Sequence, residues 1–128
     1  MSDSPTSRTL AECRKRGWQA CVVERYIPAV KRKYDAFGFG DVLVMDQFPG
    51  SLLIQATTTA HMAERVTKII EERTVAAREW LERGNRIEVW GWSKRGKAGK
   101  RKLWTVRRVD VFRGSREPLM TRVIYEAY

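Results

Sequence analysis

The stretch from Tyr34 to Thr59 constrains the fold of this chain most, because it holds two short apolar runs on either side of a turn. The runs Asp41–Met45 and Ser51–Thr57 have the composition of β-strands. Pro49 and Gly50 between them are turn-forming residues. This pattern predicts a β-hairpin around which the rest of the chain is organised.

Polar side chains occupy the ends of these two apolar strands. Side chains alternate between the faces of a strand, so Leu53, Gln55 and Thr57 share one face of the second strand. Asp41 opens the first strand, and the other residues of that strand are apolar. Isolated polar groups at the ends of apolar strands are typical of a site built on a rigid sheet.

The segment before the hairpin predicts one helix and one strand. Residues 1–7 are small and polar and are interpreted as a loose leader, whose Thr6 or Ser7 caps a helix over Arg8–Arg16. Alternation over Trp18–Ile27 predicts a first strand. The run Lys31-Arg32-Lys33-Tyr34 predicts a basic loop, which either holds phosphates or is a solvated connection.

Helical spacing follows the hairpin. Ala60–Glu72 and Thr74–Arg83 each carry an apolar stripe, and the pattern leaves open whether they form one helix or two. The polar face of the first stretch comprises His61, Arg65, Lys68 and Glu72. His61 is interpreted as a surface residue, because no second histidine or paired carboxylate lies near it in the sequence.

The last third of the chain predicts a second, strongly basic hairpin. Arg86–Trp92 and Leu103–Val111 read as strands, and Lys94–Lys102 reads as a loop. The loop cations are Lys94, Arg95, Lys97, Lys100, Arg101 and Lys102. Cations beside tryptophans suit a nucleic-acid backbone with unstacked bases, although the tryptophans also suit a core. The tail, residues 118–128, is either a last strand or a dimer contact.

Composition and element order describe a single α/β domain over residues 1–128, built on a mixed central sheet flanked by helices in the order α-β-β-β-α-β-β. The chain holds 25 Lys and Arg against 15 Asp and Glu, a net charge of +10 that favours a polyanionic partner, nucleic acid above all. We expect a cytoplasmic protein without a membrane partner, because no apolar run is long enough for a span or a signal peptide.

This element order, with an acid in the first helix and an Asp opening the second strand, resembles that of the PD-(D/E)XK nuclease superfamily. Within the superfamily, the chain is most similar to archaeal-type Holliday-junction resolvases and related phage or bacterial proteins. The resemblance covers Arg8–Val111 and implies a restriction-endonuclease-like fold. It also implies a homodimer that cuts four-way DNA junctions with Mg²⁺ or Mn²⁺.

The resemblance assigns roles to individual residues. Asp41 matches the metal-binding Asp of the motif, and Gly40 stands where the family name has Pro. Gln55-Ala56-Thr57, 14 residues further on, occupies the place of (D/E)-x-K. Glu12 matches the acid of the first helix, although by itself it reads as a surface partner of Arg8, Lys15 or Arg16.

Gln55 and Thr57 depart from the family pattern, since neither carries a charge. Lys68 or Arg65 is the candidate replacement for the missing lysine, unless both are solvated or contact phosphate. Asp35 or Glu24 is a candidate third acid, with a turn cap as the alternative for Asp35. The sequence therefore predicts a metal-dependent DNA endonuclease, with a catalytically inactive nucleic-acid-binding relative as the alternative.

Overall fold

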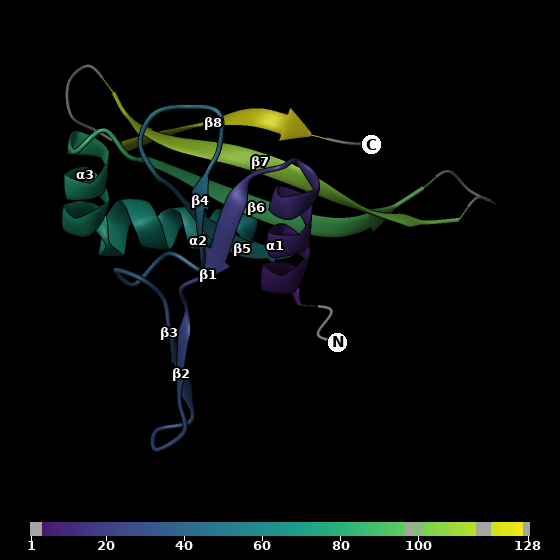
Figure 1. Cartoon of the computed structure of the whole chain (residues 1–128), viewed down its shortest axis with the longest axis horizontal. Coiled ribbons are helices and arrows are strands. Elements are labelled where there is room, and N and C mark those ends of the chain that lie inside the picture. Colours follow the sequence, from purple (N-terminus) through teal and green to yellow (C-terminus); the bar gives the residue numbers. More distant parts are fainter. Residues whose placement is uncertain (1–3, 97–98, 100, 115–118, 127–128) are drawn as a thin grey trace.

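A mixed six-stranded β-sheet forms the centre of the computed structural model, which describes residues 4–96, 99, 101–114 and 119–126 (Figure 1). Its strands lie in the order β1-β4-β5-β6-β7-β8, and only the β5–β6 pair is parallel. Their bounds are β1 Gln19–Val22, β4 Val42–Met45, β5 Leu52–Thr58, β6 Arg86–Arg95, β7 Leu103–Arg113 and β8 Leu119–Glu126. The predicted α/β fold with a mixed central sheet is confirmed.

Helices cover both faces of the sheet. Helix α1 (Pro5–Lys15) buries Cys13 against Leu52, Ile54 and Trp90. The other face packs against a 3₁₀ turn (Thr59–His61), α2 (Met62–Thr67), a π-helical turn (Lys68–Glu72) and α3 (Thr74–Glu82). Alternating residues of the central strands β4, β5, β6 and β7 therefore enter two separate cores. Among the residues described, no helix combines the length and apolarity that crossing a membrane requires.

Two expectations about the N-terminal half need correction. The helix begins at Pro5 with Ser4 as its cap, whose Oγ accepts from the Ser7 amide at 3.2 Å, so the loose leader cannot extend to residue 7. The expected strand Trp18–Ile27 is two strands in different sheets. Beyond Val22 the Val23 amide donates to the Asp41 carbonyl at 2.8 Å, and the chain then leaves the central sheet.

The departing chain forms a separate hairpin. Strand β2 (Arg25–Ile27) pairs antiparallel with β3 (Arg32–Tyr34) outside the central sheet, and this hairpin projects away from the body of the protein in Figure 1. Part of the expected basic loop Lys31–Tyr34 is therefore a strand. Alternation cannot distinguish one continuous strand from two strands that change partners, because side-chain direction is the same in both cases.

The structure also settles the secondary structure of the helical region and of the tail. The helical region is interrupted at Arg73, so the two stretches are distinct helices, and the Arg73 amide donates to the Lys68 carbonyl. The tail contributes β8, which pairs with β7. The second basic hairpin is longer than expected, because β6 continues to Arg95 beyond its last pair with β5 at Trp92.

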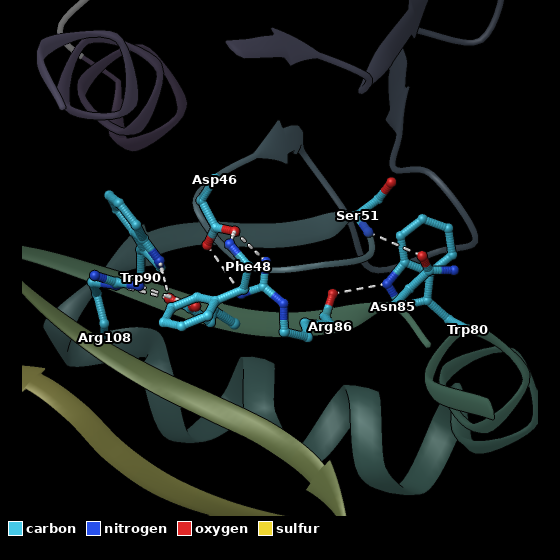
Figure 2. Close-up of polar contacts among 9 residues, drawn as sticks. Asp46, Phe48, Ser51, Trp80, Asn85, Arg86, Trp90 and Arg108 are labelled. Atoms are coloured by element: carbon cyan, nitrogen blue, oxygen red, sulfur yellow. Dashed lines mark hydrogen bonds and ion pairs between the residues drawn. The ribbon is translucent and has the colours of Figure 1, made fainter. Parts of the chain in front are cut away.

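Polar contacts fix the turn between β4 and β5 against the start of β6 (Figure 2). Arg86 pairs with the buried Asp46 carboxylate and lies over the Phe48 ring. The Asn85 carboxamide accepts from the Ser51 amide at 3.0 Å, and Trp80 donates to the Arg86 carbonyl at 2.8 Å. These contacts hold the parallel β5–β6 register and therefore the position of the end of β5.

A buried ion pair stabilises the α1 face of the same sheet. The carboxylate of Glu88, 2% exposed, accepts from Arg108 at 2.8 and 3.1 Å and from Trp90 Nε1 at 2.8 Å (Figure 2). The two tryptophans of β6, Trp90 and Trp92, are core residues, whereas Trp104 of β7 is 43% exposed. The alternative that the tryptophans are core therefore holds for two of these three.

Gly40 allows the close approach that places the start of β4 against β5. A Cβ on Gly40 would lie 2.3 Å from Cγ of Leu53, a core residue that is 1% exposed. Gly40→Ala is therefore expected to destabilise the protein by about 1–3 kcal/mol, as overpacking of a core does. Urea unfolding measures this change.

A double-mutant cycle identifies the cause of that destabilisation. In a Leu53→Ala background the obstructing side chain is gone, so the added cost of Gly40→Ala is expected to fall below about 1 kcal/mol. If Gly40→Ala lowered the free energy of unfolding equally in the wild type and in Leu53→Ala, the steric explanation would be contradicted.

Candidate functional site

Asp41 lies at the start of β4 and is 3% exposed. Its backbone amide donates to the Ile54 carbonyl at 2.8 Å, which aligns it with the middle of β5. The carboxylate Oδ2 accepts from Gln55 Nε2 at 2.7 Å and from the Ala56 amide at 2.9 Å. The predicted neighbours Asp41 and Gln55 are therefore in direct contact.

Two more carboxylates lie beside Asp41. Glu24 precedes β2 and Asp35 follows β3, so the base of the projecting hairpin supplies both. One ligand oxygen from each of Glu24, Asp35 and Asp41 lies within 4.8 Å of the other two. Asp35 and Glu24, each weighed as a third acid from the sequence, both join Asp41, and we call these three residues the acidic cluster.

Burial, together with the neighbouring acids, raises the pKa of Asp41 to about 8. Burial is the largest cause, followed by the hydrogen bond with Asp35 and the repulsion of Asp35 and Glu24. The Ala56 amide opposes this shift because it donates to the ionised form. Without a counter-ion, Asp41 therefore holds a proton at neutral pH.

Gln55 contributes an unsatisfied oxygen at the edge of the cluster. The residue is 3% exposed, and its Nε2 is bound to Asp41. Its Oε1 is buried and has no hydrogen-bond partner within the described part of the chain. A buried carbonyl oxygen without a donor is costly in free energy, so this atom is available to bind a group outside the described chain.

Two lysines lie next to the acidic cluster. Lys68 Nζ, from the π-helical turn after α2, is 3.9 Å from Asp35 Oδ2. Lys33 Nζ, from β3, is 3.9 Å from Glu24 Oε1. Thr57, at the position of the motif lysine, is buried. Lys68 thus reaches the cluster from the helical layer, as the replacement hypothesis requires.

Other predicted site residues lie elsewhere. Glu12 is on α1, against the opposite face of the sheet, and pairs with Arg16 at 2.8 Å, which matches the surface-partner interpretation. It is not one of the acids that the described structure groups together. Arg65, on α2, is partly buried, and no described residue accepts from its Nε.

The predicted nucleic-acid contacts fall on two projecting hairpins. Lys31, Arg32 and Lys33 are exposed on the β2–β3 hairpin. Lys94 and Arg95 end β6, Arg101 and Lys102 are exposed just before β7, and Lys97 and Lys100 lie outside the described residues. Cations therefore project from the body of the protein at two places.

The donor set suits a hard divalent cation. Three carboxylates and one amide oxygen are the ligand types that Mg²⁺ and Mn²⁺ prefer. The three carboxylate oxygens lie within 4.8 Å of one another, close to the separation of about 4.2 Å between opposite ligands of one octahedral Mg²⁺. The residues present therefore fit such an ion, which would also neutralise the mutual repulsion of the acids.

The acidic cluster predicts an unusual dependence of stability on pH. The pKa of Asp41 is 3.8 when unfolded and about 8 when folded, so the folded state binds more protons between these values. Its stabilising contribution is complete below pH 3.8 and is lost as the pH rises to about 8. In EDTA, the free energy of unfolding is therefore expected to fall between about pH 6 and about pH 9, by on the order of 2–3 kcal/mol, and the melting temperature is expected to fall with it.

Calorimetry with and without Mg²⁺ tests this origin. Added Mg²⁺ is expected to raise the melting temperature more at about pH 9 than at about pH 6, because only ionised acids bind it well. The Asp41→Asn variant, which cannot ionise, serves as the control and is expected to lack the fall in EDTA. An equal fall in the variant would assign the pH dependence to other groups.

Comparisons of the chain with protein-family models, with curated proteins and with solved structures find no match.

Proposed function

We propose that this protein is a Mg²⁺- or Mn²⁺-dependent DNA endonuclease that hydrolyses phosphodiester bonds at the acidic cluster. The observation that carries the proposal is the cluster of three carboxylates, in which Asp41 accepts from Gln55, a residue whose buried amide oxygen has no partner among the described residues. Such a donor set is costly to bury without a cation. In addition, a net charge of +10 favours a polyanionic substrate.

The residues of the site divide the chemistry among them. Glu24, Asp35 and Asp41 would hold the metal, with Gln55 Oε1 as a neutral ligand. A bound Mg²⁺ supplies a water of lowered pKa and stabilises the charge that develops on the phosphate. Lys68, beside Asp35, would orient the attacking water and donate to a phosphate oxygen.

The resemblance to Holliday-junction resolvases supports a finer proposal about the substrate. A four-way junction presents two symmetric cutting positions, and a symmetric homodimer presents two symmetric sites. We therefore propose a homodimer that selects branched DNA. Glu12, which the resemblance had assigned to the site, is replaced in this proposal by Glu24 and Asp35.

A second candidate is a nucleic-acid-binding protein without catalysis. The buried Thr57 favours it, because a hydroxyl replaces the cation that the resemblance leads us to expect at the end of β5. In that case binding would depend on salt and would be indifferent to chelator.

Incubation with DNA and metals separates the two candidates. A labelled four-way junction and a linear duplex of the same arm sequence are each treated with protein in Mg²⁺, Mn²⁺ or EDTA. Symmetric nicking of the junction in either metal, absent in EDTA, is the expected result. Tight binding of junction without cleavage in any metal would transfer the proposal to the non-catalytic binder.

A further inference from the structure

The β2–β3 hairpin is a separate, projecting element, and residues 25–34 are called the arm here (Figure 1). It forms its own two-stranded sheet, with pairs Arg25–Tyr34, Tyr26–Lys33 and Ile27–Arg32. Its side chains are largely exposed, including Tyr26 at 55%, Val30 at 54% and Tyr34 at 47%. An element that contributes so little to the core needs another reason for its shape.

Charge is sharply divided along this hairpin. The arm carries four cations, Arg25, Lys31, Arg32 and Lys33, and no acid. The residues directly before and after it are Glu24 and Asp35, both in the acidic cluster. Of these cations, only Lys33 forms an ion pair with a carboxylate that the structure describes. A polyanion bound to the arm would therefore be held next to the candidate metal site.

Cations occur on both faces of the arm. Directly paired residues share a face, so Arg25, Tyr34, Ile27 and Arg32 lie on one face and Tyr26 and Lys33 on the other. A single nucleic-acid strand lying along a ribbon would contact one face only. Cations on both faces match the two phosphate walls of a groove.

The dimensions of the arm agree with one groove in particular. Three paired residues in each strand extend about 10 Å, and the major groove of B-form DNA is about 8.5 Å deep and about 12 Å wide, enough for a two-stranded ribbon. The minor groove is about 6 Å wide, and the major groove of double-stranded RNA is too narrow for side chains to read. At the tip, Pro28, Ala29 and Val30 are exposed and suit contact with base edges.

We propose that the arm enters the major groove of duplex DNA and so places a backbone phosphate at the acidic cluster. This proposal rests on the proposed function, from which it takes DNA as the polyanion. It adds that the bound DNA is a B-form duplex rather than a single strand, and that double-stranded RNA is not bound in this way.

Binding measured without cleavage tests the arm. In EDTA, the anisotropy of a labelled DNA duplex is compared with that of its single strand and of double-stranded RNA of the same sequence. The variant Arg25→Gln/Arg32→Gln removes two arm cations, and Arg14→Gln/Lys15→Gln removes two exposed cations of α1 as the matched control. Melting temperatures confirm that both variants fold.

The arm variant is expected to lose about tenfold in duplex affinity and to lower the slope of log affinity against log salt by about 2, as two lost phosphate contacts do. The control is expected to lose less than about threefold. Guanine N7, which lies in the major groove, is expected to be protected from dimethyl sulfate by the wild type and not by the arm variant.

Any one of three results would overturn the proposal. These are an equal loss of duplex affinity in the arm variant and the control, no protection of guanine N7 by the wild type, and double-stranded RNA bound as tightly as DNA. Arm-dependent duplex binding without cleavage in any metal would support the arm while refuting the endonuclease. Cleavage at the wild-type rate by the arm variant would support the endonuclease while refuting the role of the arm. The two proposals therefore fail in different measurements.

Discussion

Replacement of Asp41 by Asn is expected to reduce metal-dependent cleavage by on the order of 10³-fold or more, because it removes the central ligand of the acidic cluster. Asparagine keeps an acceptor for Gln55 Nε2 and the Ala56 amide, so the backbone geometry is expected to persist. DNA affinity in EDTA is expected to stay within about threefold of wild type, since that affinity comes from the cations.

The same substitution is expected to stabilise the metal-free protein above neutral pH. Burial and neighbouring acids hold the pKa of Asp41 at about 8, so ionising this group costs free energy that a neutral amide avoids. A higher melting temperature together with lost cleavage would mark a residue retained for function at the expense of stability. Cleavage that survives in this variant would refute the assignment of the metal site.

Glu12 provides the matched control. Glu12→Gln also neutralises one acid, but on α1 and against the opposite face of the sheet, where the carboxylate pairs with Arg16. Its cleavage rate is expected to remain within about threefold of wild type, as for a surface ion pair. A loss as large as that of Asp41→Asn would restore Glu12 to the site and would displace Glu24 or Asp35.

Replacement of Lys68 by Ala is expected to lower the cleavage rate by about 10²-fold, the usual cost of one group that stabilises a transition state. Lys68 Nζ lies 3.9 Å from Asp35, and the motif position is occupied by the buried Thr57. Because the lysine acts on the reacting phosphate and water, KM for DNA is expected to change little while kcat falls.

Lys68→Arg and Lys15→Ala complete that experiment. Arginine keeps the positive charge and is expected to recover part of the rate, whereas Lys15→Ala removes an exposed lysine of α1 without effect. If Lys68 only balanced the charge of Asp35, its removal would alter the melting temperature and Mg²⁺ affinity but not kcat in saturating Mg²⁺. That outcome would refute the hypothesis that Lys68 takes the role of the motif lysine.

The central hairpin was predictable because its contacts are local. Strand alternation placed Gln55 and Thr57 on one face, and pairing of β4 with β5 brings Asp41 and Gln55, 14 residues apart, into contact. Turn residues and apolar runs determine such a hairpin with little help from the rest of the chain.

The path of the chain before the hairpin was not predictable. Trp18–Ile27 alternates throughout, yet the chain leaves the sheet after Val22 and pairs again as β2 with β3. This exit moves Glu24 and Asp35 to the base of the arm. The visible signal was a pair of acids on either side of a stretch whose charged residues are all cations, and it acquires meaning only when the stretch is known to be a hairpin.

The sequence by itself determined the α/β class and the β4–β5 hairpin, because these follow from side-chain periodicity and short-range pairing. The resemblance to the nuclease motif, rather than periodicity, named Asp41 and Gln55 as neighbours, and the two side chains are in contact. The tertiary structure alone decided that Glu24 and Asp35, rather than Glu12, lie beside Asp41, and that Lys68 reaches Asp35. The physical reason is that burial, opposite sheet faces and the packing of a distant helical turn depend on contacts between residues far apart in the chain, which local pattern does not encode.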